Sequence, residues 1–172
     1  MNNIDSSLPA LAQKIKEIMS IHPKEKGIVH CHSYKIASYI KKHVKSRRII
    51  VHDSENREEM LAKHIASPEP TILLSPSMTE GVDLKDDLSR FQIVCKVPFP
   101  YLGDPVTRKR MKKHTWWYSY ATAKTLLQSM GRSIRNESDH AVTYVLDSDW
   151  KKFYSNNRKL FPEDFDDLLH IM

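Results

Sequence analysis

The chain has 172 residues, of which 40% are hydrophobic and 28% charged, a composition ordinary for one soluble globular domain. Its 27 Lys and Arg against 21 Asp and Glu give a net charge of +6, which favours partners that carry phosphate. No apolar run approaches the roughly 18 residues of a membrane-spanning helix, and the first residues do not resemble a signal peptide. The composition argues against a membrane partner, and we expect one cytoplasmic domain over residues 1–172.

The predicted elements alternate between two periodicities along the chain. Apolar residues recur at helical spacing before Pro23, so residues 1–25 should form a helix that packs on the rest of the domain. The predicted strands cover 27–32, 48–52, 71–74, 91–97 and 141–146, and the predicted helices cover 34–44, 57–65, a broken stretch over 105–134 and a last helix from 150. This alternation predicts an α/β fold with a mostly parallel sheet and helices on both faces. Ligands of such folds bind at the carboxyl ends of the strands.

Two cysteines lie inside predicted strands, where small buried hydrophobic residues are expected. Cys31 and Cys95 therefore indicate neither a disulfide nor an iron–sulfur cluster. His30 and His32 flank Cys31 and could suggest a metal site, but no matching second pair of ligands is evident, so we expect no metal. The same segment begins like the phosphate loop of a cysteine phosphatase, but the arginine that such a loop needs would fall on Ala37.

Basic residues are concentrated at 41–48 and 108–114, and such patches attract phosphate backbones without reading sequence. The second patch precedes an aromatic cluster at 116–120, which could stack on unpaired bases or form the core face of the long helix. We expect most of this cluster to be core, with a DNA-facing role left open. Acidic residues gather instead at 163–167, which we interpret as a solvated helix or tail.

A polar turn over residues 75–83 follows the third predicted strand. Its serine and threonine hydroxyls, Ser75 and Thr79 among them, could hold the phosphates of a nucleic-acid backbone. Asp83, which ends the turn, could accept hydrogen bonds from a ribose hydroxyl. A capped turn with a positive φ at Gly81 is the structural alternative.

The segment QSMGRSIR, residues 128–135, places an amide and two guanidinium groups in one row. Gln128, Arg132 and Arg135 fall at i, i+4 and i+7, so they share a face if the helix continues through them. Gly131 lets another backbone approach closely. Arginine forks in such a row suit a polyphosphate, and a nucleotide is the obvious candidate.

Four motifs in this order resemble the second RecA-like motor domain of superfamily 2 DNA helicases, in the XPD/DinG branch. The resemblance covers about residues 27–150. It rests on CHSY at 31–34, TEGVD at 79–83, VPFP at 97–100 followed by DP at 104–105, and QSMGRSIR at 128–135. Two departures are His140, where the family usually has glycine, and Asp149, where it often has arginine.

The resemblance implies a RecA-like three-layer fold and a role for each motif. Arg132 and Arg135 would reach the γ-phosphate of ATP, with Arg135 as the arginine finger and Gln128 orienting that contact. Gly81, Asp83, Glu80 and Gly131 would line the ATP site, with Asp83 at the ribose and Glu80 fixing the loop between nucleotide and DNA. The residues implied to contact single-stranded DNA are Ser33, Tyr34, Ser75 and Thr79.

No P-loop and no acidic box are present in the sequence, so Mg²⁺ would be held mainly by an amino-terminal RecA-like motor domain. We therefore expect the chain to be inactive alone and to be either the carboxyl-terminal part of a longer ATP-dependent helicase or one half of a split motor acting in DNA repair or replication. The alternative is a non-catalytic nucleic-acid-binding module that keeps the fold and uses neither arginine.

Overall fold

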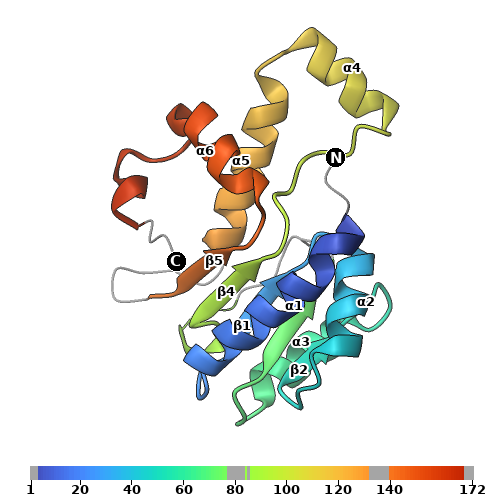
Figure 1. The fold of residues 1–172 in the computed structure, drawn as a ribbon, viewed down its shortest axis with the longest axis vertical. Helices are drawn as coiled ribbons and strands as arrows, with labels where there is room; N and C mark the ends of the chain where they lie inside the picture. Colours follow the sequence, from blue (N-terminus) through green and yellow to red (C-terminus); the bar gives the residue numbers. More distant parts are fainter. Residues whose placement is uncertain (1–3, 77–83, 85, 132–139, 169–172) are drawn as a thin grey trace. The chain divides into compact units, whose positions relative to one another are not determined.

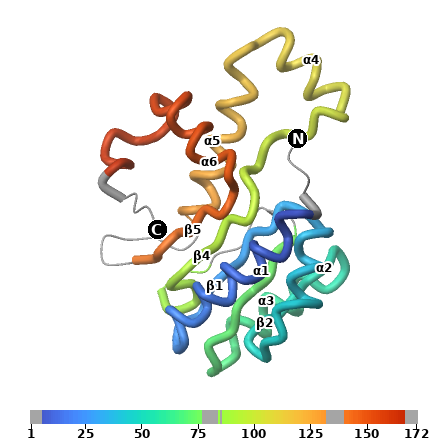
Figure 2. The backbone as a smooth tube through the Cα atoms, viewed as in Figure 1, coloured from blue at the N-terminus to red at the C-terminus, as the bar shows by residue number. Residues whose placement is uncertain are grey.

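The computed structural model describes residues 4–76, 84, 86–131 and 140–168 (Figure 1). The chain divides into two compact units, one formed by residues 1–96 with 130–147 and the other by residues 97–129 with 148–172. The chain leaves the first unit after its fourth strand and returns to it for the fifth, as the colour change along the tube in Figure 2 shows. Each unit therefore combines segments that are distant in sequence.

The first unit contains a five-stranded sheet in which every neighbouring pair is parallel. The strands are β1 (Gly27–His30), β2 (Ile49–Val51), β3 (Ile72–Ser75), β4 (Phe91–Val94) and β5 (Val142–Val145). Their order across the sheet is β2-β3-β1-β4-β5, so β2 and β5 are the edges. The predicted strands are confirmed. Four of them are shorter than expected, and β3 has the expected length but begins one residue later.

Three helices of the first unit follow the predicted ranges closely. They are α1 (Ile4–Ile21), α2 (Tyr34–His43) and α3 (Arg57–Ala66), and a short 3-10 helix covers Asp86–Leu88. The structure thus confirms an α/β fold of the RecA-like kind. None of the helices among the described residues is both long and apolar enough to cross a membrane.

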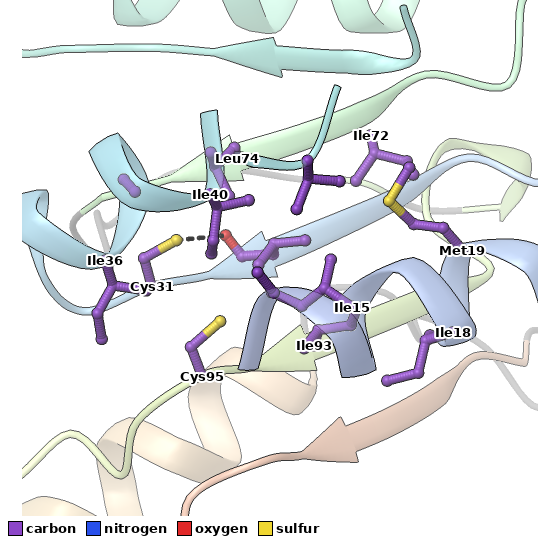
Figure 3. Close-up of a cluster of buried hydrophobic side chains, with 14 of the residues drawn as sticks. Ile15, Ile18, Met19, Cys31, Ile36, Ile40, Ile72, Leu74, Ile93 and Cys95 are labelled. Carbon is purple, nitrogen blue, oxygen red and sulfur yellow. Dashed lines mark hydrogen bonds between the residues drawn. The ribbon is translucent and has the colours of Figure 1, made fainter. Parts of the chain in front are cut away.

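One face of the sheet is covered by α1 and α2 (Figure 3). Alternate strand residues such as Val29, Leu74 and Ile93 point to this face, as the two-residue period of a strand requires. They pack against helix residues spaced by three or four, with Ile15 of α1 and Ile40 of α2 almost fully buried. Cys31 and Cys95 are free thiols in the same layer, as the sequence predicted, and burial raises the pKa of the Cys31 thiol.

The opposite face is covered by α3, with Leu84 and Leu88 packed beside it. Ile28, Ile50 and Leu73 point to this side and pack with the fully buried Leu84. Met60 and Leu61 of α3 close the cluster. Helices on both faces of a parallel sheet leave the carboxyl ends of the strands as the open edge of the layer.

The second unit is helical and has an aromatic core. Its elements are α4 (Pro105–Lys113), α5 (Trp117–Met130) and α6 (Asp149–Asn156), followed by 3-10 turns at Arg158–Leu160 and Glu163–Leu168. The last residue of α5, Met130, is counted with the first unit. Phe99 stacks on Tyr118 with ring centroids 5.9 Å apart and meets Phe153 edge to face at 5.4 Å. Phe153 in turn contacts Phe161.

A single arginine side chain joins the carboxyl end of α1 to the segments that precede β1, β2 and β3 in the first unit. The guanidinium of Arg48 donates to the carbonyl oxygens of Met19, His22, Glu25 and Pro70 at 2.7 to 3.0 Å. These bonds tie the end of α1, the loop before β1 and the approach to β3 to the start of β2. Arg48 was predicted as part of a phosphate-attracting patch, but its charge serves the fold.

Candidate nucleic-acid interface

The carboxyl ends of β1 and β3 bring two predicted DNA-contacting segments to the same edge of the sheet. His30 of β1 and Ser75 of β3 are register partners, and the Cys31 N–H donates to the Ser75 carbonyl at 2.9 Å. Ser33 follows β1 by three residues, so both predicted serines lie where neighbouring strands end. The structure therefore places Ser33 and Ser75 at one edge.

Ser33 is the amino-terminal cap of α2. Its backbone is extended, with φ −167°, and its hydroxyl oxygen accepts a hydrogen bond from the Ile36 N–H at 3.4 Å. Because that oxygen acts as the acceptor, its hydroxyl hydrogen can be donated to a phosphate at the positive end of the helix. Tyr34 begins the helix with 57% of its surface exposed, so its ring is open to a ligand.

Ser75 is buried and hydrogen-bonded to a histidine that the sequence analysis did not single out. His52 follows β2, and its Nε2 lies 3.1 Å from the Ser75 hydroxyl oxygen. Its Nδ1 lies 3.1 Å from the Asp53 carbonyl, which only accepts, so the tautomer that fits this contact has its hydrogen on Nδ1. Nε2 then accepts from the Ser75 hydroxyl. Ser75 can donate to a phosphate only when that hydroxyl turns away from His52.

Asp53 fixes the loop whose carbonyl accepts the second hydrogen bond of His52. Its carboxylate accepts from the N–H groups of Glu55 and Asn56 at 2.9 and 3.0 Å, and these bonds hold its pKa below the usual value. The Asn56 side-chain oxygen accepts a hydrogen bond from the Asp53 N–H at 2.9 Å. His52 is the last residue of the strand predicted over 48–52 and Asp53 follows it directly, so polar residues at the end of that strand were the signal that could have identified both.

His32 occupies a left-handed backbone conformation directly after β1, with φ 51°. Its ring stacks near that of His30, with centroids 6.4 Å apart. Burial, with smaller contributions from His30 and Lys96, lowers the pKa of His32 to about 3, so the ring is neutral at physiological pH. The expected strand over 27–32 therefore ends early because the chain turns sharply at this residue.

The predicted nucleotide-binding row is described only at its beginning. Gln128 is exposed on α5, which ends at Met130, and Gly131 is exposed in the following turn. The expected helix extended to residue 134. Arg132 and Arg135 lie outside the described residues, as do Thr79, Glu80, Gly81 and Asp83 of the polar turn. Their roles stay predictions.

The aromatic cluster is more exposed than the sequence analysis expected. Trp116 and Tyr120 expose 62% and 46% of their surfaces, whereas Trp117 and Tyr118 are half-buried. The expectation that most of the cluster is core is therefore wrong for two of its four large rings. An aromatic run looks the same in sequence whether its rings point inward or outward, so the pattern could not distinguish the two.

Metal-ligating side chains do not cluster in the part of the chain that the structure describes. No group of three or more His, Cys, Asp or Glu residues there could hold a metal ion. Glu163, Asp164 and Asp166 are exposed as predicted, and Asp166 pairs with Arg158 at 2.7 Å.

Comparison with known proteins connects this arrangement to one family. The family described as "Helicase C-terminal domain" matches residues 15–167. The "ATP-dependent DNA helicase DinG" of Photobacterium profundum is 31% identical over 115 residues, which cover 58% of this chain and 16% of that protein. The "ATP-dependent DNA helicase CHL1" of Candida albicans is 30% identical over 88 residues, covering 41% of this chain and 10% of the relative.

Solved structures show the same fold. "Structure of S. tokodaii Xpd4" superposes with a TM-score of 0.67 at 20% identity and covers 88% of this chain and 32% of that one. A structure described as "XPD_Helicase" gives a TM-score of 0.69 at 18% identity, covering 93% and 31% of the two chains. This chain thus spans about a third of the length of these structures and less of the curated relatives.

Proposed function

Because the chain belongs to the helicase C-terminal domain family of XPD- and DinG-type helicases, we propose that it is the second motor domain of an ATP-dependent DNA helicase. The observation that carries the proposal is the family match over residues 15–167, which includes all four motifs in order. The printed names of the relatives describe ATP-dependent DNA helicases, and this chain would supply only part of such a machine.

The nucleotide side of the proposed mechanism rests on arginine chemistry. Arg135, supported by Arg132 and oriented by Gln128, would stabilise the charge that builds on the transferring phosphoryl group of ATP. Asp83 would accept from the ribose, Glu80 would fix the loop that carries it, and Gly81 and Gly131 would allow close backbone approach. ATP and its Mg²⁺ would be held mainly by an amino-terminal RecA-like motor domain, in the same protein or in a split partner.

The DNA side of the proposal is supported by the edge of the sheet. Ser33 can donate its hydroxyl hydrogen to a phosphate at the amino end of α2, and the exposed ring of Tyr34 lies next to it in sequence. Ser75 and Thr79 would continue this track for single-stranded DNA. Ser75 would join it by turning its hydroxyl away from His52.

The test measures ATP hydrolysis by the chain mixed with its amino-terminal motor domain and saturating single-stranded DNA. We expect Arg135→Ala to lower the rate by about 10³- to 10⁵-fold, the usual effect of losing an arginine finger. Arg135→Lys should fail similarly, because an ammonium cannot reproduce the planar fork.

Arg47→Ala is the matched control, because Arg47 is an exposed arginine near the edge strand β2 and should leave the rate unchanged. A loss of less than tenfold for Arg135→Ala would contradict the proposal. If DNA binding persisted while the chain did not stimulate hydrolysis at all, a non-catalytic binding module would be the better description.

A further inference from the structure

The net positive charge of the chain is concentrated in one stretch of the second unit. Residues 105–131 carry six Lys and Arg and no Asp or Glu, while the rest of the chain has 21 basic and 21 acidic residues. Five of the six cations are in α4, which has only nine residues. The whole excess of +6 is therefore located on α4 and α5.

Helix α4 gains little from packing. Thr107 is its one buried residue, and its amino end is held by Asp104, which caps the N–H groups of Val106 and Thr107 at 3.1 and 3.0 Å. Short helices are marginal unless a face is buried, and like charges along a helix repel. A polyanion laid on α4 would relieve that repulsion.

Three of the α4 cations are available to such a partner. The Arg108 guanidinium donates to the carbonyls of Leu102 and Gly103, and the Arg110 guanidinium lies over the Trp117 ring at 5.7 Å. Lys109, Lys112 and Lys113 are exposed, and among the described residues none of them forms an ion pair with a carboxylate. They are spaced by three and four residues, so they share one face of the helix.

Two open aromatic rings follow directly after these lysines. Trp116 lies between α4 and α5, and its ring meets that of Tyr120 at 5.6 Å in an edge-to-face arrangement. His114, which caps the end of α4, lies 6.0 Å from Trp116. Trp116 exposes 62% of its surface. Contact between this aromatic ring and water is unfavourable, so a ligand that covers the ring would gain free energy.

We propose that Lys109, Lys112 and Lys113 of α4, with Trp116 and Tyr120, form a second contact for single-stranded nucleic acid, in which the lysines bind phosphates and Trp116 stacks on an unpaired base. This inference deepens the proposed function and relies on it only for the choice of ligand. Cations beside exposed aromatic rings are the combination that binds single strands without reading sequence. A duplex, whose bases are stacked internally, would use only the lysines.

The experiment measures binding of fluorescein-labelled oligothymidylate to the 172-residue chain by anisotropy, without nucleotide. We expect Trp116→Ala to weaken binding by about 5- to 150-fold, the range for loss of one stacked base, and Trp116→Phe to retain most of the affinity. Tyr101→Ala is the matched control: Tyr101 is 79% exposed in the same unit, and its ring lies beside Gly103 rather than Trp116. It should change affinity less than twofold.

Charge is tested separately by replacing Lys109, Lys112 and Lys113 with Gln. The slope of log affinity against log salt should fall by about 2, since each phosphate contact to a single strand contributes about 0.7. The control replaces Lys16, Lys24 and Lys63, three exposed lysines of the first unit that lie outside both basic stretches, and removes the same net charge.

The inference is overturned if Trp116→Ala and Tyr101→Ala bind equally, if the two triple variants have equal salt slopes, or if a duplex binds as tightly as the single strand with the same dependence on Trp116. Unchanged circular dichroism of Trp116→Ala excludes misfolding as the cause of weaker binding. The proposed function is tested independently, because Arg135→Ala affects hydrolysis and should leave this binding unchanged. An effect of Trp116 without an effect of Arg135 would retain the inference and reject the motor role.

Discussion

The hydrogen bond between His52 and Ser75 shows how one buried pair can decide what a binding residue is able to donate. The Ser75 hydroxyl is shared between an internal acceptor and any phosphate at the sheet edge. Replacing Ser75 alone should therefore lower the free energy of unfolding more than replacing both residues. The buried His52 nitrogen would then have neither water nor a protein donor to bind.

We predict that Ser75→Ala lowers the free energy of unfolding by about 1 to 3 kcal/mol. The double variant with His52→Phe should lose less than the sum of the two single variants, with a coupling energy of about 0.5 to 3 kcal/mol. Urea unfolding of the four proteins completes the cycle. Strict additivity would show that the two side chains do not interact.

The neutral ring of His32 makes the stability of the chain depend on pH. Its pKa is about 3 in the folded state against 6.5 for an ordinary histidine, so between these values the unfolded chain binds the additional proton. Stability is therefore complete above about pH 6.5 and declines as the pH falls toward 3. His30 and Lys96 are the positively charged or titratable neighbours that add to this effect.

We expect His32→Asn to remove a loss of about 2 kcal/mol that the wild-type chain suffers between pH 7.5 and pH 5. Asparagine is suited to the test because it tolerates the left-handed backbone at this position. Burial also lowers the pKa of His64, but His64 is present in both proteins, so its contribution to the pH dependence cancels in the comparison. Parallel pH dependences in denaturant titrations of the two chains would refute the assignment.

At the scale of elements, the hydrogen bonds of the Arg48 guanidinium connect α1 to the amino ends of the strands. We predict that Arg48→Lys destabilises the chain by about 2 to 4 kcal/mol, because an ammonium cannot reach carbonyls on three separate segments at once. Thermal and urea unfolding measure the loss. The neighbouring Arg47→Lys, at an exposed position, should stay within about 0.5 kcal/mol of wild type.

The elements themselves were largely predictable because their apolar residues follow the helical and strand periods over the whole length. The ends were not. The first strand stops at His30 instead of residue 32, and β4 stops at Val94 instead of residue 97, because backbone turns end strands where the apolar pattern continues. The aromatic cluster at 116–120 has no such periodicity, so its sequence did not indicate which of its rings are exposed.

At the scale of the whole molecule, the motifs and the family could be predicted from the sequence, since they are local strings in a fixed order. The partners of individual side chains could not. His52 with Ser75, and Arg48 with the carbonyls around it, join residues more than 20 positions apart. Only the folded sheet brings them together, and no spacing rule in the sequence encodes such pairs.

The brevity of β2 has a consequence for how copies of this chain meet one another. An edge strand presents unpaired backbone groups that can recruit a strand from a neighbouring molecule, the first step toward aggregation. Here that margin of the sheet offers only Ile49–Val51, preceded by two arginines. An edge strand of this length offers few backbone groups for pairing, and the arginines before it repel a second copy. Both features disfavour pairing between β2 strands of neighbouring molecules in concentrated solution.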